Sequence, residues 1–147
     1  MTSFAVQISD FAKKAKTNSD LAVRGIVSDI IRRLDARSPV GDPSYWKHPA
    51  PKNYRPGTFR GNWQLGVNII PTGETGRIDP SGEATVSINI ASIPEHAAGT
   101  IVYLANNLPY ARPIEDGYSR QAPAGVVGLT AVEFQSIVQD SVTGLAA

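Results

Sequence analysis

The residues of this chain that could carry out chemistry are few and scattered. Its two histidines, His48 and His96, lie in different segments, and the sequence contains no cysteine. A metal site needs ligands at set spacings, such as the two histidines of H-E-x-x-H, and neither histidine belongs to such a pattern. The sequence therefore predicts no metal centre, no thiol nucleophile and no bound cofactor.

The other candidates for catalysis are a serine and a pair of carboxylates. Ser119 lies in a run that approaches the G-x-S-x-G nucleophile motif, but Gln121 replaces the second glycine. Glu115 and Asp116 are adjacent, and adjacent acids in a turn are ordinarily solvated rather than tuned for acid–base catalysis. We therefore expect a protein that is not an enzyme.

Length and composition bound the class of protein. The chain has 147 residues, of which 41% are hydrophobic and 18% are charged, as in an ordinary globular domain. No apolar run approaches the roughly 18 residues of a membrane span, and the N-terminus lacks the apolar core of a signal peptide. We expect a single domain over residues 1–147 that does not contact a membrane.

Charge is divided unevenly between the two halves of the chain. The net charge of +1 is too balanced for wholesale binding to nucleic acid or to an anionic membrane. Residues 1–60 hold eleven basic and five acidic residues, whereas residues 61–147 hold three and eight. If the halves present opposite faces, neighbouring copies can meet head to tail in a ring. The alternative is that these charges pair within the chain.

The N-terminal segment predicts two helices. Apolar residues recur every three or four positions over residues 4–34, which indicates amphipathic helix. Residues 17–20 (Thr-Asn-Ser-Asp) are favourable N-caps and unfavourable in a helix interior. We therefore expect a short first helix and a longer second one that begins near Asn18 or Ser19 and ends near Arg37.

Alternating apolar residues predict an antiparallel sheet of three to four strands. The expected strands are residues 59–70, 83–90, 100–105 and a short fourth segment at 110–115. The fourth would be an edge strand, because Pro113 has no N–H to donate. Thr130 and Glu133 fit a capping box that begins a C-terminal helix. The fold class is therefore α+β, with N-terminal helices, a sheet and a C-terminal helix.

Turn-forming residues predict three long loops, at about 38–58, 71–82 and 116–128. The first carries five prolines, and loops of this length in a compact domain tend to be functional. Its aromatic residues, Trp46 and Tyr54 among them, can bind a partner or anchor the loop onto the core of the same domain.

Basic residues of the N-terminal helices suggest a different class of function. Lys13, Lys14 and Lys16, with Arg32 and Arg33 further on, could contact phosphates from a helix face. No aromatic platform lies between them, so a solvated polar face is the competing interpretation.

Four short motifs, taken in order, resemble one protein family. They are Ser38–Pro43 (SPVGDP), Phe59–Gln64 (FRGNWQ), Asn106–Ala111 (NNLPYA) and Ile114–Gly125 (IEDGYSRQAPAG). Together, over nearly the whole chain, they resemble the tail-completion (neck, head–tail joining) proteins of tailed bacteriophages. Many members of that family run directly from a Pro-Val-Asp-Thr-Gly turn into the strand, whereas this chain inserts a segment rich in proline and aromatic residues.

The resemblance implies a structural virion protein that forms a hexameric ring where the tail tube meets the head connector. Its implied partners are further copies of itself, the tail tube protein and the head connector or adaptor proteins, with genomic DNA in the lumen as a further contact. The implied location is the neck of the virion, and the host cytoplasm during assembly.

Aromatic and arginine residues are candidates for the subunit and partner interface, since Tyr, Trp and Arg are enriched at interface centres. Polar residues of the same loops are further candidates. The candidates together are Trp46, Tyr54, Tyr110, Arg112, Glu115, Tyr118, Ser119 and Gln121. The competing interpretation is local packing of the rings and capping of loop backbone by the polar side chains.

Other functions stay open at this point. Within the virion, the chain could instead be a tail terminator that caps the tail tube. Outside that class, it could be a nucleic-acid-binding module that uses the basic N-terminal helices, or a small hydrolase with a titrating residue in a pocket.

Overall fold

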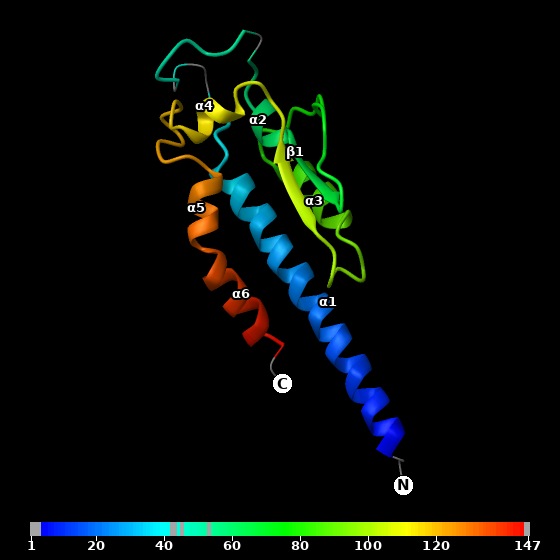
Figure 1. The fold of residues 1–147 in the computed structure, drawn as a ribbon. Coiled ribbons are helices and arrows are strands. Elements are labelled where there is room, and N and C mark those ends of the chain that lie inside the picture. The colour runs from blue at the N-terminus through cyan, green and yellow to red at the C-terminus, as the bar shows by residue number, and fades with distance from the viewer. Residues whose placement is uncertain (1–3, 42–43, 45, 53, 146–147) are drawn as a thin grey trace.

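A computed structural model describes residues 4–41, 44, 46–52 and 54–145. The helices and strands are α1 (Phe4–Arg37), α2 (Thr58–Gly61), β1 (Trp63–Val67), α3 (Glu83–Ala91), β2 (Val102–Asn106), α4 (Ala111–Glu115), α5 (Val127–Val132) and α6 (Phe134–Thr143). The long helix α1 is the axis of the molecule, with α5 and α6 along one side and the sheet and α3 along the other (Figure 1). The fold is therefore mixed helix and sheet, as the sequence predicts.

The helix α1 is continuous, so the predicted break at residues 17–20 is wrong. The hydroxyl of Ser19 donates to the carbonyl of Ala15 at 2.9 Å, a bond that a helix interior tolerates. The carboxylate of Asp20 accepts the N–H of Ala98 at 3.0 Å and lies 3.1 Å from Nδ1 of His96. Because these polar groups find partners without leaving the helix, they do not end it.

The sheet has two antiparallel strands in the described residues, with the register running from Trp63↔Asn106 to Val67↔Val102. The three to four strands expected from the sequence are therefore not confirmed. The first strand begins at Trp63 and not at residue 59, because residues 58–61 form the helix α2. Its far end is closed by Asn68, which has a left-handed φ of 62° and whose side chain accepts the N–H of Ile101 at 2.9 Å.

The predicted strand at residues 83–90 is the helix α3. Its apolar residues alternate, but Val86, Ile90 and Ile93 also follow helical spacing, and they pack beside Val27 and Ile31 of α1. The apolar pattern alone could not separate the two structures.

The buried carboxylate of Asp79 favours a helix over a strand in the residues that form α3. One oxygen of Asp79 accepts the N–H of Gly82 at 3.1 Å, and the other accepts the N–H and the hydroxyl of Thr85 at 2.8 and 2.7 Å. These bonds satisfy donors in the first turn of α3 that have no partner within the helix. Burial alone would raise the pKa of Asp79, but the hydrogen bonds outweigh it and hold the pKa below its ordinary value.

The side-chain amide of Asn89 lies along the edge of β1 where the sequence predicts a neighbouring strand. Asn89 of α3 is 3% exposed. Its Oδ1 accepts the N–H of Leu65 at 3.2 Å, and its Nδ2 donates to the carbonyl of Trp63 at 3.0 Å. The amide thus takes the donor and acceptor that a neighbouring strand would use, and the helix can cover this edge of β1.

The predicted edge strand at residues 110–115 is the short helix α4. Pro113 lies in its first turn, where a backbone N–H has no acceptor within the helix in any case. Pro113 has no backbone N–H, which led to the prediction of an edge strand, but the first turn of a helix tolerates this absence equally well.

The C-terminal helix is present, but the predicted capping box is not. The hydroxyl of Thr130 donates to the carbonyl of Val126 at 3.0 Å within α5. The carboxylate of Glu133, between α5 and α6, forms ion pairs with Arg33 and Arg37 of α1. Glu133 therefore ties the C-terminal helices to α1 and does not cap its own helix.

Two apolar clusters form the core. One joins the end of α1 to α2, β1, α4 and the neighbouring loops through Leu34, Trp46, Phe59, Trp63, Leu108, Ile114, Ala122 and Val126. The other joins the middle of α1 to the segment that follows α3 through Val27, Ile31, Ile93 and Ala97, and Val86 and Ile90 of α3 pack against it. Within the described ranges, none of the helices combines the length and the apolar character needed to cross a membrane.

We predict that Asn89→Ala lowers the free energy of unfolding by about 2 kcal/mol, because it leaves a buried N–H and a buried carbonyl of β1 without partners. Urea denaturation measures the change. The matched control is Ser87→Ala, an exposed position of the same helix, for which we expect a change within about 0.5 kcal/mol. Equal effects of the two substitutions would contradict the role assigned to Asn89.

Candidate functional site

The eight residues predicted for an interface lie at one end of the molecule, called here the loop end. It comprises the described residues of 38–57, the helix α4 and residues 116–126, which lie together beyond the end of α1 (Figure 1). Trp46 and Ser119 form an isolated antiparallel bridge, and the N–H of Lys47 donates to the carbonyl of Tyr118 at 2.8 Å. Segments about 70 residues apart in sequence are thus held side by side. Asp42 and Pro43, which belong to the first motif, are outside the described residues.

Three of the predicted aromatic residues pack against one another. The rings of Trp46, Tyr54 and Tyr110 meet edge to face, with centroids 5.4 to 5.7 Å apart. Trp46 is 8% exposed and belongs to the core cluster, against which both tyrosines pack. Burial, with the neighbouring Tyr54 adding to it, raises the pKa of Tyr110 to about 12. In this single chain, the three rings anchor the loop end to the core.

Glu115 binds the backbone at the start of α5. Its two carboxylate oxygens accept the N–H groups of Val126, Val127 and Gly128, each at 2.8 Å. Burial alone would raise the pKa of Glu115, but these three donors outweigh it and hold the pKa below the ordinary value of 4.5. The carboxylate supplies acceptors that the first turn of α5 otherwise lacks, and it holds this helix against α4.

Ser119 and Gln121 also serve the internal structure of the loop end. Ser119 is 2% exposed, and its hydroxyl accepts the N–H of Gln121 at 3.3 Å. The Oε1 of Gln121 accepts the N–H groups of Val40 and Gly41 at 3.1 and 2.7 Å. One amide oxygen therefore joins the loop that leaves α1 to the loop that leads into α5.

Tyr118 and Arg112 are the predicted site residues that project most clearly into solvent. Tyr118 is 42% exposed, and its ring lies 4.9 Å from that of His48. Arg112 has a side chain 84% exposed and forms an ion pair with Asp116, the residue that follows α4. These two residues remain available to a partner.

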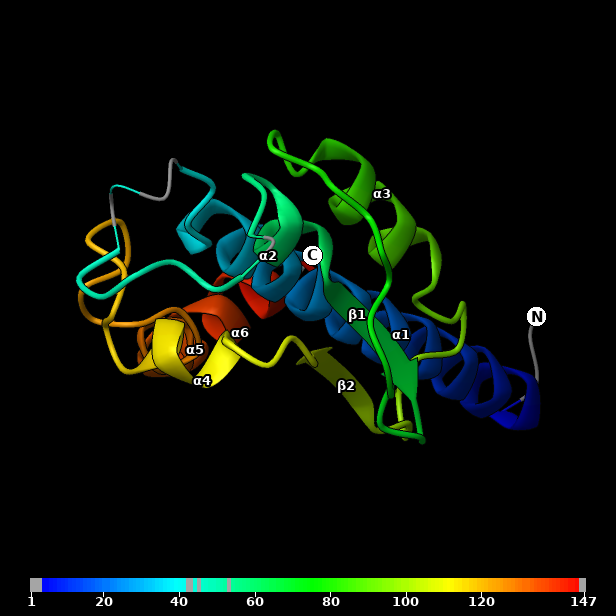
Figure 2. The ribbon, with the colours of Figure 1, turned by 90° about the horizontal axis from the view of Figure 1, so that it is seen from above.

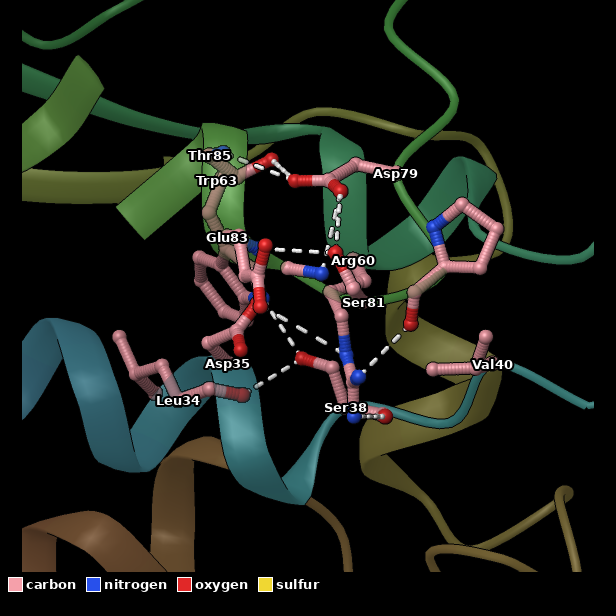
Figure 3. Close-up of polar contacts among 12 residues, drawn as sticks. Leu34, Asp35, Ser38, Val40, Arg60, Trp63, Asp79, Ser81, Glu83 and Thr85 are labelled. Atoms are coloured by element: carbon pink, nitrogen blue, oxygen red, sulfur yellow. Dashed lines mark hydrogen bonds and ion pairs between the residues drawn. The ribbon is translucent and has the colours of Figure 1, made fainter. Parts of the chain in front are cut away.

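A polar cluster at the end of α1, which the sequence did not predict, joins the first two motifs (Figure 3). The indole N–H of Trp63 donates to the hydroxyl of Ser38 at 2.7 Å, and that hydroxyl donates to the carbonyl of Leu34 at 2.6 Å. Arg60 donates to the carbonyls of Ser38 and Pro80 at 3.1 and 2.8 Å. We call Ser38, Arg60 and Trp63 the helix-end cluster.

The arginine of this cluster also neutralises a buried acid. The Nε of Arg60 lies 3.7 Å from Oδ1 of Asp35, and both side chains are largely buried. Burial raises the pKa of Asp35, Arg60 opposes that rise, and Asp79 adds to it. The cation thereby stabilises the last turn of α1, where free carbonyls and Asp35 both favour positive charge.

Each of the other residues of the second motif has its own structural role. Phe59 is a core residue, 2% exposed. Gly61 must lack a side chain, because a Cβ there would lie 2.3 Å from the carbonyl oxygen of Arg77. Asn62 donates to the carbonyl of Thr58 at 2.8 Å and accepts the N–H of Thr75 at 2.9 Å. The motif is thus a scaffold that binds the loop of residues 71–82, and the only sequence signal for it is its clustered composition.

Polar side chains around a cavity at the end of α1 form hydrogen bonds and ion pairs within the chain. A cavity of about 480 Å³ opens beside the helix-end cluster, and Arg37, Arg60 and Gln121 contribute to its wall. Arg37 is held by Thr130 and Glu133, and the other two side chains bind the protein backbone. Among the residues that the structure describes, no three histidine or acidic side chains gather as a metal site would require.

Apolar side chains are exposed on several parts of the surface outside the loop end, among them α1, the α5–α6 pair and the residues next to the two strands, Ile69, Ile70 and Ile101. The N-terminal half of α1 projects beyond the rest of the molecule (Figure 1), and residues 5–17 are exposed throughout. Phe11 is 74% exposed there. On α5 and α6, Val132 and Phe134 are 84% and 50% exposed.

We predict that Glu115→Gln lowers the free energy of unfolding by about 1 kcal/mol at pH 7, because one amide oxygen replaces two charged acceptors at the start of α5. Since the pKa of Glu115 is lowered by folding, its contribution is present above pH 4.5 and is lost as the pH falls through the folded-state pKa. The difference between wild type and variant, measured by denaturation, should therefore shrink below pH 4.5. A difference that stays constant down to pH 3 would contradict this role.

Comparisons of this chain with protein-family models, with curated proteins and with solved structures each found no match.

Proposed function

We propose that this chain is a structural component of the neck of a tailed bacteriophage, forming a ring that joins the tail tube to the head connector. The observation that carries the proposal is that the four motifs on which the resemblance rests form one hydrogen-bonded unit. Trp63 and Arg60 of the second motif bind Ser38 of the first, and Gln121 of the fourth binds Val40 and Gly41.

The third motif joins the same unit. Asn106 donates to the carbonyl of Phe59 at 2.8 Å, and Tyr110 packs against Trp46 and Tyr54. The four motifs therefore belong to one packed unit of the chain, which supports treating them as a single ordered set.

The distribution of surface groups supports an assembled rather than a catalytic role. Glu115 at the loop end caps α5 and Arg60 in the helix-end cluster pairs with Asp35, while apolar side chains are exposed on α1, α5 and α6. A ring component needs a rigid core and surfaces that neighbouring copies cover. A tail terminator is the alternative within the same class, since it has the same needs and differs in its place along the virion.

The mass of the purified chain in solution tests the proposal. We expect light scattering to find, as concentration rises, a species of several times the 15.7 kDa of one chain, six times if the ring is hexameric. Negative-stain images of that species should show closed rings, and virions should carry the chain at the neck. A chain that stays monomeric at high concentration and is missing from virions would overturn the proposal.

A further inference from the structure

The outer edge of β2 carries backbone groups that have no partner. In an antiparallel pair, residues alternate between those that bond to the neighbouring strand and those that face away from it. The N–H of Asn68 donates to the carbonyl of Ile101, so Tyr103 also bonds to β1, whereas Val102 and Leu104 face away from it. Within the part of the chain that the structure describes, nothing bonds to the outward N–H or carbonyl of Val102 or Leu104.

The opposite edge of the sheet shows how such groups can be satisfied. On β1, the outward N–H of Leu65 and the outward carbonyl of Trp63 bond to the side-chain amide of Asn89. Among the described residues, β2 has no counterpart to this amide. In Figure 2, β1 lies on one side of β2, and no strand lies on the other. The outer edge of β2 is therefore open.

The sequence of β2 does not block the addition of a strand. Exposed strand edges usually carry a lysine, a proline or a bulge, each of which keeps other strands away. The residues of β2 are Val-Tyr-Leu-Ala-Asn, all half-buried, and they pair with β1 without a break in register. The edge is therefore a template on which a further strand can form.

An apolar groove lies beside this edge. Its volume is about 470 Å³, and its walls include Ile30 and Leu34 of α1, Leu104 of β2, and Val127 and Phe134 of the C-terminal helices. The side chains of Val102 and Leu104 pack on the side of the sheet that faces α1. Residues directly opposite each other in an antiparallel pair have side chains on the same face. A segment bonded to Leu104 therefore points its own side chains toward the groove.

The unpaired backbone groups, rather than the groove, identify the kind of occupant. A helix uses its N–H and carbonyl groups within itself and has none to offer along its length. An extended segment offers an N–H and a carbonyl at every second residue, which is the spacing at which Val102 and Leu104 offer theirs. The groove adds that these residues of the occupant are apolar.

The described part of this chain offers no such segment to a second copy. Each of its connecting stretches of five or more described residues contains a proline, which cannot donate to a ladder. Several backbone N–H groups in these stretches already bond within the chain, among them those of Lys47, Asp79 and Ala98.

The strand β2 of a second copy fits poorly as well. It is bonded to β1 along its inner edge, so it brings a sheet and the helix α1 with it. The groove has α1 as its floor and the C-terminal helices as its opposite wall, which favours a single added strand over a second sheet. The occupant is therefore a segment of a different protein.

We propose that an extended segment of a different protein, apolar at every second residue, adds antiparallel to the outer edge of β2. Its backbone bonds to Val102 and Leu104, and its apolar side chains enter the groove. This inference goes beyond the proposed function and does not depend on it, because it concerns a contact with a protein other than this chain.

Amide hydrogen exchange of the isotope-labelled chain tests the proposal, with the synthetic peptide acetyl-Lys-Val-Thr-Val-Thr-Val-Lys-amide as the probe. Without peptide, the outward amides of Val102 and Leu104 should exchange faster than that of Tyr103, which is bonded to β1. At a peptide concentration about four times the dissociation constant, we expect the two outward amides to exchange about fivefold more slowly. The control peptide carries N-methylvaline at each valine, which removes the donors, and it should cause no slowing.

A pair of variants tests the part played by the groove. Ala131 lines the groove, so Ala131→Trp fills it, and we expect at least about tenfold weaker binding of the peptide. Ser136→Trp is the matched control, because Ser136 is exposed on α6 and lies outside the groove. It should bind the peptide as the wild type does.

The remaining outcomes would overturn the proposal. Equal binding of the N-methylated peptide, or peptide binding without slower exchange of Val102 and Leu104, would show an apolar contact and not an added strand. Slower exchange of these two amides when the chain alone is concentrated would identify a second copy as the occupant. Exchange that no soluble concentration of the peptide alters would show that the edge does not accept a strand.

Discussion

The hydroxyl of Ser38, where α1 ends, is the hydrogen-bonding centre on which the positions of the other elements depend. It accepts the indole N–H of Trp63 and donates to the carbonyl of Leu34, which fixes the start of β1 against the last turn of α1. Arg60 adds bonds to the carbonyls of Ser38 and Pro80, so the loop before α3 is held at the same point. From there Gln121 and the three packed aromatic rings secure the loop end.

The parts of the fold that could be predicted from sequence are those governed by local periodicity. The apolar repeat predicts the helical character of residues 4–37, though not the continuity of α1, and it predicts α6. Alternation predicts the central part of β1, and β-branched and aromatic residues predict most of β2. The prediction fails over residues 83–90, where one pattern fits both strand and helix. The deciding contacts there are those of Asp79 with Thr85 and of Asn89 with β1, and such tertiary hydrogen bonds leave no trace in a periodicity.

The candidate site, like the fold, could be predicted from the sequence only in part. The sequence singled out Trp46, Tyr54 and Tyr110, and the structure does bring them together. It did not indicate that Glu115 caps α5 or that Gln121 holds the first loop, because those bonds join segments distant in sequence. Capping of loop backbone was the alternative interpretation for these polar residues, and their contacts in the single chain agree with it. Whether the exposed Tyr118 and Arg112 meet a partner stays a prediction.

The central claim is that the chain assembles with further copies of itself, which cover apolar side chains exposed on α1, α5 and α6. Hydrogen exchange of the amides of these three helices, followed as the protein concentration rises from that of the monomer to that of the assembly, tests this claim most directly. The account predicts stronger protection of these helices in the assembly than in the monomer, since a helix covered by a partner opens less often than one that faces solvent. Exchange of all three helices that stays equally fast in the assembled state would contradict it.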